Sequence, residues 1–400
     1  MKRLFALILA ICLLCTLASC KTDPAASTGS TTTSPEASTQ DINAPETDVT
    51  VQQQPMVAVA VPVVTESAAA DDGTVLFNQT FQNISLIVPD PEVADKIIVD
   101  FLNRTDVNDD AEYIRSLSEE IYSDGITPYY PFWAQIAYDP MRIDRGVLSL
   151  YGSYATYTGG AHGLYNFKAV TYDLVTGEIL SLRDILNETT TSDNICQLVL
   201  DSLTAQKEEE RLFEGFESTV TELFNNGFQQ NTDWFFSNTG LCFFFSPYEI
   251  GPFSSGDIVA EIPYSKLTVI LNDAYFPAER ETALGTVQAE VFDETALDRF
   301  TQFAEVVLEE GSDKILLHTD KSVYDVRIET GTWSADGSIF TPSHTVLAAY
   351  SLTPGDAIMI DSPLNSTLPT LRLSYTTGNQ TVCFFISLDT AENTVTLTEG

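Results

Sequence analysis

A glycine-rich loop carries the histidine with the clearest potential for chemistry in this sequence. The stretch Tyr157-Thr158-Gly159-Gly160-Ala161-His162-Gly163 surrounds His162 with three glycines, and Tyr165 follows closely. Glycine permits positive φ and close backbone approach, so a ligand could reach this loop. An imidazole tip and tyrosine rings are typical contacts to a sugar or a partner protein. The candidate ligand-binding residues are therefore Tyr157, Gly159, Gly160, His162, Gly163 and Tyr165.

The same loop also fits a structural role, as a hairpin held by a hydrogen bond from His162 to the backbone. Tyrosines are ordinary cross-strand residues. Alternation along a strand places Tyr151 and Tyr157 on one face and Tyr154 on the other, so only part of the tyrosine cluster can form one surface. The loop leads into a strand rather than a helix, which argues against phosphate binding.

Motifs for catalysis are absent from the sequence. The three histidines, His162, His318 and His344, never lie within four residues of each other, so the usual His-x-x-x-His zinc site cannot form. Neither Gly-x-Ser-x-Gly nor Ser-x-x-Lys occurs, and no calcium loop is present. We therefore expect no catalytic residue, no metal and no cofactor, and a binding protein rather than an enzyme.

The charge balance narrows the choice of partner. The chain has 57 acidic and 19 basic residues and a net charge of −38. Nucleic acid is excluded as a partner because phosphate contacts need clustered Lys and Arg. A basic protein would be attracted and would associate faster. The alternative is that the acidic surface only keeps the protein soluble.

The N-terminus has the pattern of an export signal. Lys2 and Arg3 precede an apolar run that, at about 14 residues, is shorter than the roughly 20 needed to span a bilayer. The run ends in Leu17-Ala18-Ser19-Cys20, which resembles the lipobox of bacterial lipoproteins. That resemblance implies lipidation of Cys20 and a lipid anchor on the outer face of the cell membrane.

Three further cysteines lie in the remainder of the mature chain: Cys196, Cys242 and Cys383. Their number is odd and their spacing wide, which is typical of neither a zinc site nor a disulfide framework. Two alternatives stay open: one Cys196–Cys242 bridge, or three small apolar side chains inside the fold.

Composition divides the chain into four parts. Residues 1–20 form the signal peptide, and residues 21–72, rich in Ser, Thr, Ala and Pro, predict a disordered tether. Residues 73–275 alternate helical and strand patterns, which predicts an α+β domain with helices on a largely antiparallel sheet. Short strands separated by turn residues in 286–400 predict an all-β C-terminal domain, either a sandwich or a small barrel.

Two motifs resemble those of a known family. The first is Tyr157–Gly163 with Tyr172-Asp173 and Thr176-Gly177-Glu178. The second runs Phe243-Phe244-Phe245-Ser246-Pro247-Tyr248-Glu249-Ile250-Gly251-Pro252-Phe253 and closes with Ile262-Pro263-Tyr264-Ser265-Lys266-Leu267. In this order they resemble the extracytoplasmic PdaC/RsiV-like superfamily, over residues 75–270.

The resemblance implies two kinds of envelope ligand. The superfamily includes a lysozyme-sensing ectodomain and the accessory region of a peptidoglycan deacetylase. We therefore expect the chain to bind a lysozyme or another cationic protein in the cell envelope. The alternative is a protein that binds cell-wall glycan, peptidoglycan above all, or takes part in its processing.

Replacing Cys20 with alanine tests the anchor. Cys20→Ala removes the thiol that would carry the lipid, so the protein is expected to leave the membrane fraction or to remain unprocessed. Membrane fractionation and the mass of the mature chain measure both. Normal processing with retention in the membrane would show that the anchor is not at Cys20.

Overall fold

The computed structural model describes residues 55–400 apart from 107, 127–129, 207–210, 227–232, 281–283, 310–312 and 365–367. All described residues belong to one compact unit, Gln53–Gly400. The predicted signal peptide, Cys20 and the predicted tether up to residue 54 lie outside the described residues. Within the described ranges, no helix has both the length and the apolarity to cross a membrane.

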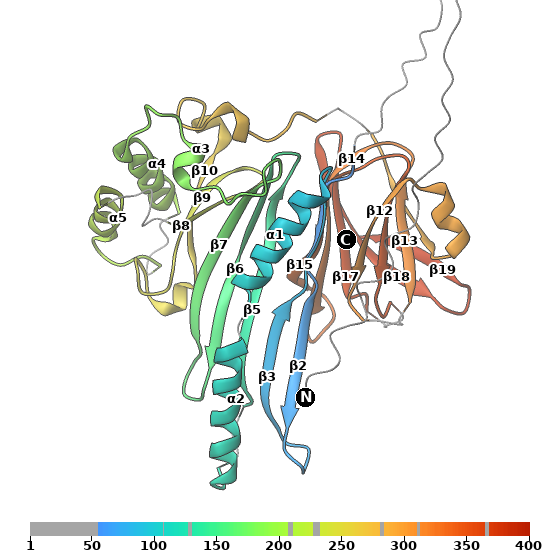
Figure 1. Cartoon of the computed structure of the whole chain (residues 1–400), viewed down its shortest axis with the longest axis horizontal. Helices are drawn as coiled ribbons and strands as arrows, with labels where there is room; N and C mark the ends of the chain where they lie inside the picture. Colours follow the sequence, from blue (N-terminus) through green and yellow to red (C-terminus); the bar gives the residue numbers. More distant parts are fainter. Residues whose placement is uncertain are drawn as a thin grey trace, which may run out of the picture. The chain divides into compact units, whose positions relative to one another are not determined.

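A five-stranded sheet with strand order β2-β3-β5-β6-β7 is the centre of the first half (Figure 1). Its strands are antiparallel except for the parallel pair β3 and β5. They are β2 (Val63–Ala69), β3 (Val75–Gln82), β5 (Phe132–Ile143), β6 (Val147–Tyr157) and β7 (Leu164–Asp173). Two helices pack on one face, α1 (Pro91–Arg104) and α2 (Asn108–Ser123).

Helix α1 forms where its sequence pattern places it. The Asp90 side chain accepts a hydrogen bond from the backbone N–H of Glu92 at 2.9 Å, and Pro91 occupies the first turn. Val93, Ile97 and Phe101 follow at helical spacing and are buried against the sheet. An acidic N-cap, a proline in the first turn and apolar residues at helical spacing therefore account for this helix.

A three-stranded sheet, β10-β9-β8, covers the other face of the five-stranded sheet. Its strands are β8 (Asp233–Phe236), β9 (Gly240–Phe245) and β10 (Ile258–Pro263). Its far side packs against α4 (Ser192–Ala205) and α5 (Phe216–Asn225), and α3 (Leu182–Ile185) adds to the same core. Three 3₁₀ turns accompany it: η1 (Phe253–Ser255), η2 (Tyr264–Lys266) and η3 (Asp273–Tyr275).

The C-terminal segment is almost entirely strand. A four-stranded sheet, β11-β13-β16-β12, and a seven-stranded sheet, β19-β18-β17-β14-β15-β1-β4, enclose one apolar core. The first contains β11 (Val287–Val291), β12 (Gln302–Val307), β13 (Lys314–Thr319) and β16 (Asp356–Asp361), with η4 (Glu294–Arg299) beside it. The second contains β1 (Ala58–Ala60), β4 (Ser85–Ile87), β14 (Val323–Trp333), β15 (Phe340–Leu352), β17 (Leu371–Thr377), β18 (Gln380–Asp389) and β19 (Thr394–Glu399). The expected order, helices with antiparallel sheet and then a β-rich C-terminus, is confirmed.

Three expectations need correction or a decision. The tether does not extend to residue 72, because residues 56–61 are a buried apolar run and β1 pairs with β15 on one side and β4 on the other. The seven-stranded sheet also takes β4 from the N-terminal half, so sheet pairing crosses the predicted boundary at 275–286. Cys196 and Cys242 are both buried and free, so no bridge joins them.

Shortening a buried side chain of the expected tether tests its place in the core. Met56 is 1% exposed among the apolar residues of the C-terminal core, so Met56→Ala is expected to lower the free energy of unfolding by about 2–5 kcal/mol. Urea unfolding measures this, with Val75→Ala, which is 41% exposed, as the control. A change no larger than in the control would place residue 56 outside the core.

Candidate functional site

The loop 159–163 is a tight connection between β6 and β7. Gly159 and Gly160 both have φ of +99°, a conformation that favours glycine. Tyr157 donates from its hydroxyl to the Gly160 carbonyl at 3.1 Å. His162 Nδ1 lies 2.9 Å from the Gly163 carbonyl, to which its N–H tautomer donates. The loop is therefore held by side-chain hydrogen bonds to its own backbone.

Gly163 is fixed by its neighbours rather than by its φ angle. A Cβ atom there would lie 2.8 Å from the Trp133 ring and 2.7 Å from the Thr156 carbonyl oxygen. Trp133, on β5, stacks on Tyr157 with centroids 6.0 Å apart and meets Tyr165 edge-on at 6.0 Å. The close approach at Gly163 thus lets Trp133 join the two tyrosines of the candidate site.

The second motif supplies the other half of the site. The His162 ring stacks on Phe253, with centroids 4.1 Å apart and planes 25° apart. Tyr165 and Tyr248 each lie 5.9 Å from the same Phe253 ring. Two loops that lie about 90 residues apart in the sequence therefore contribute rings to one cluster. Contacts between residues this distant in sequence are long-range and raise the contact order of a fold.

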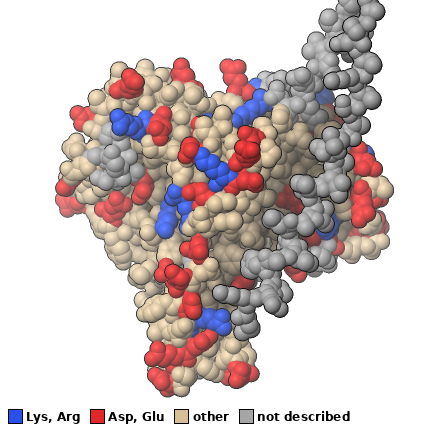
Figure 2. Space-filling model, in the orientation of Figure 1, with Lys and Arg blue, Asp and Glu red and all other residues tan. Residues whose placement is uncertain are grey.

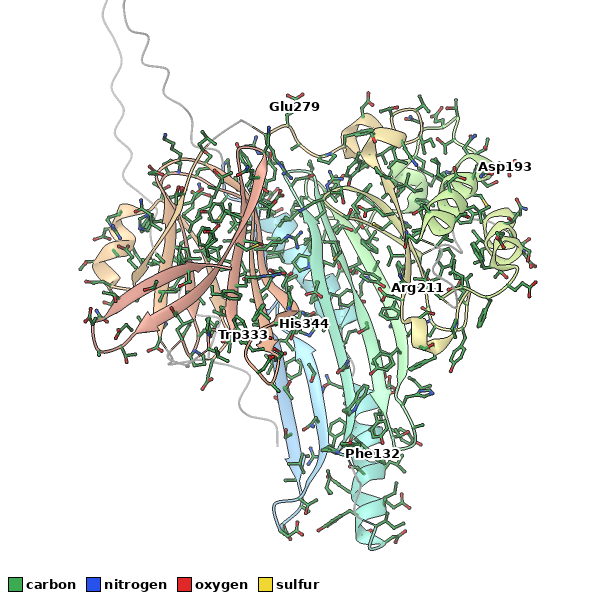
Figure 3. The ribbon with its side chains drawn as sticks, turned by 180° about the vertical axis from the view of Figure 1, so that it is seen from behind. Phe132, Asp193, Arg211, Glu279, Trp333 and His344 are labelled. Atoms are coloured by element: carbon green, nitrogen blue, oxygen red, sulfur yellow. The ribbon has the colours of Figure 1, made fainter. Side chains whose placement is uncertain are left out.

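We call the resulting group the aromatic surface; its members are Trp133, Tyr157, His162, Tyr165, Tyr248 and Phe253. Figure 3 labels Phe132, which precedes Trp133 on β5 and packs edge-on against Tyr157 at 6.1 Å. Tyr165 is 40% exposed and Tyr248 is 62% exposed, so part of the aromatic surface faces solvent. Exposed rings beside half-buried ones are typical of a recognition surface.

Tyr248 adopts a strained backbone conformation. Its φ is +73°, which costs a non-glycine residue roughly 1–3 kcal/mol. Its N–H donates to the Gly251 carbonyl at 2.9 Å, and the Ser246 N–H donates to the Glu249 carboxylate at 3.0 Å. Burial raises the pKa of Glu249. The turn therefore holds an exposed ring in a position that an unconstrained chain would avoid.

The 3₁₀ turn η1 contains Phe253, and a hydrogen bond from this turn to a neighbouring segment holds it in place. The Ser255 hydroxyl donates to the carbonyl of Arg211, a residue labelled in Figure 3, at 2.8 Å. A Cβ at Gly251 would lie 2.5 Å from that same carbonyl oxygen. Arg211 thus anchors the loop that carries Phe253 to the segment between α4 and α5.

Other tyrosines near the candidate site have different roles. Tyr151 stacks on Phe235 at 4.4 Å and donates to Asp257 at 2.7 Å, while Tyr154 points to the other face and donates to Asp110 at 2.5 Å. Burial raises the pKa of both phenols. The predicted division of Tyr151 and Tyr154 between two faces is confirmed.

The structure unites the six candidate residues but adds three that sequence reasoning missed. Trp133, Tyr248 and Phe253 were not among the predicted contacts. Tyr248 and Phe253 do lie within the second quoted motif, which was the available signal, whereas no local pattern marks Trp133. Among the described residues, no group of three His, Cys, Asp or Glu side chains is placed to hold a metal.

Comparison with known proteins finds a family match over part of the chain that includes most of the second motif. Residues 183–265 match DUF3298, a family described as a protein of unknown function. This segment contains most of the second motif, while the loop 159–163 precedes it. No curated protein matches the chain.

Two solved structures are similar over about half of the chain. A DUF3298 member from Bacteroides fragilis NCTC 9343 is 18% identical with a TM-score of 0.41, and covers 55% of this chain and 94% of its own. A DUF3298 protein from Pseudomonas aeruginosa PAO1 is 16% identical with a TM-score of 0.38, and covers 55% of this chain and 97% of its own.

Substituting Gly163 tests the packing that unites the site. Gly163→Ala forces its Cβ against Trp133 and the Thr156 backbone, and is expected to destabilise the protein by about 1–3 kcal/mol and to shift tryptophan fluorescence. Gly146→Ala is the control, since the nearest atom to its Cβ would be 3.7 Å away. Equal stability and equal emission spectra for the two variants would refute the tight packing.

Proposed function

We propose that this chain is an envelope lipoprotein whose aromatic surface captures a cationic protein of the lysozyme kind. The observation that carries the proposal is the joining of His162 and Phe253 from two separate loops into one partly exposed ring cluster. Rigid aromatic side chains supply large contact area at low cost in conformational entropy, which suits a binding surface.

Charge supports a basic partner. The net charge is −38, and Figure 2 shows acidic side chains spread over the visible face, with basic ones in a few places. A field of one sign speeds the encounter with an oppositely charged protein and is weakened by salt. The aromatic rings would then supply the short-range contact that separates one basic protein from another.

The family resemblance supports the same assignment. The two motifs that resemble the PdaC/RsiV-like superfamily contribute four of the six residues of the aromatic surface, Tyr157, His162, Tyr248 and Phe253. Tyr165 lies two residues after Gly163, the end of the first motif. A lysozyme-sensing ectodomain is one member of that superfamily. In this proposal the lipid on Cys20 holds the protein at the outer face of the cell membrane.

A second candidate function is binding of cell-wall glycan. It is favoured by the ring pairs Trp133–Tyr157 and His162–Phe253, because flat aromatic surfaces with polar tips are also suited to sugar rings. Both candidates use the same surface, so one set of variants tests them together.

Binding to lysozyme tests the proposal directly. His162→Ala and Tyr248→Ala are each expected to weaken lysozyme binding by about tenfold or more, as loss of a central contact does. Raising salt from about 0.05 M to about 0.5 M is expected to slow association more than it changes dissociation. Surface plasmon resonance on the soluble chain measures both effects.

The matched control is Tyr113→Ala, which removes a tyrosine that is 68% exposed on α2. Cytochrome c serves as a basic protein of unrelated shape, and purified peptidoglycan tests the glycan alternative. Equal binding of lysozyme and cytochrome c, or equal loss in all three variants, would refute the lysozyme assignment. Binding to peptidoglycan alone, lost in the His162 variant, would instead support the glycan alternative.

A further inference from the structure

A polar pocket of about 480 Å³ lies at the edge of the five-stranded sheet and shares no residue with the aromatic surface. Its lining includes Arg104 at the end of α1, Tyr138 on β5, Asn166 and Lys168 on β7, and Asp233 on β8. The volume is within the range of pockets that hold small molecules. Four of these five side chains carry a charge or an amide, so the pocket suits a polar ligand.

The two basic side chains have donors to spare. Arg104 Nε donates to Asp100 at 2.6 Å, and Asp100 is itself held by the Tyr172 hydroxyl at 2.8 Å. Among the described residues, the two terminal nitrogens of Arg104 and the ammonium of Lys168 donate no hydrogen bond to the protein. The Lys168 ammonium lies 5.2 Å from the centre of the Tyr154 ring. Asp100 therefore orients Arg104 and leaves its outer nitrogens for a ligand.

Tyr138 places a hydroxyl donor in the same pocket. The residue is only 3% exposed, yet within the described part of the chain its hydroxyl has no hydrogen-bond partner. Burial raises its pKa to about 12, so the phenol keeps its proton at neutral pH. Although most of the ring is buried, the hydroxyl oxygen remains accessible from the pocket, where it can donate to a ligand acceptor.

Strand register explains why the space beside Tyr138 is open. Tyr138 pairs with Gly152 on β6, and Gly152 pairs with Lys168 on β7, so the three residues lie in one row on one face of the sheet. A Cβ at Gly152 would lie 1.9 Å from the Ala137 carbonyl oxygen, so no side chain can fill the middle of the row. The backbone thus forms a floor between the phenol and the ammonium.

We propose that this pocket binds a small zwitterion, of the size of an amino acid or a dipeptide. Its carboxylate would lie between Arg104, Lys168 and the Tyr138 hydroxyl. Its ammonium would face Asp233, with the Asn166 amide available to a peptide group. The carboxylate of Asp233 disfavours a dianion such as phosphate in the same space. The proposal does not depend on the function proposed for the aromatic surface.

Titration with glycylglycine, an achiral zwitterion, tests the pocket by NMR. Saturable shifts are expected at the Gly152 backbone amide and the Asn166 side-chain amide. Arg104→Gln and Lys168→Gln are each expected to weaken binding by about tenfold, because each removes a charge-assisted contact. Acetate, which lacks the ammonium, is expected to bind about tenfold more weakly than glycylglycine.

The matched control is Arg115→Gln. Arg115 pairs with Glu119 four residues away on α2, as Arg104 pairs with Asp100 on α1, but it lies outside this pocket. Its variant is expected to bind like the unchanged protein. No saturable shift, or equal weakening in all three variants, would overturn the proposal. Equal affinity for acetate, or tighter binding of inorganic phosphate, would overturn the zwitterion assignment. Circular dichroism of each variant confirms the fold.

Discussion

The fold depends on one buried guanidinium, that of Arg142 on β5, which is 2% exposed. It donates to Asp144 at 2.8 and 2.5 Å, to the Tyr264 hydroxyl at 2.8 Å and to the Tyr275 carbonyl at 2.7 Å, and it lies 4.9 Å from the Phe236 ring. A buried charge that loses a partner destabilises a protein by about 3–5 kcal/mol. The Arg142 guanidinium therefore joins the end of β5 to strand β8 and to the segment 264–275.

A second arginine, Arg327, joins the end of β5 to the C-terminal sheets. Arg327 on β14 donates to the carbonyls of Pro140 and Met141 at 2.6 and 2.9 Å, beside the register shift between Pro140 and Arg142. On the neighbouring strand β15, which carries the His344 labelled in Figure 3, the Thr345 N–H donates to Asp139 at 2.7 Å. Trp133, at the start of the same strand, belongs to the aromatic surface, so β5 runs from that surface to this junction.

Local sequence patterns predicted the helices and strands of this fold better than they predicted which strands and residues contact each other. The alternation of Tyr151 and Tyr154 and the α+β pattern of residues 73–275 depend on residues close in sequence, and both were predicted. The apolar run 56–61 was wrongly predicted to be part of the Ser- and Pro-rich tether. Its partner strand β15 lies almost 290 residues later, so no pattern of neighbouring residues could reveal the pairing. The contact between His162 and Phe253 escaped for the same reason, although each residue stood in or beside a recognised motif.

The placement of positive charge connects these observations. The chain has 19 Lys and Arg in total, and several are used inside the fold or in pairs: Arg142 and Arg327 at the β5 junction, Arg280 with Asp325, and Arg372 with Glu329. Arg142, Arg280 and Arg372 each pair with a carboxylate, so these pairs leave the net charge of −38 and its attraction for a basic partner unchanged. Against that background, Arg104 and Lys168 facing one pocket are a local exception to the sign of the surface. Long-range charge therefore favours cationic proteins, whereas a small carboxylate would depend on short-range contacts inside the pocket.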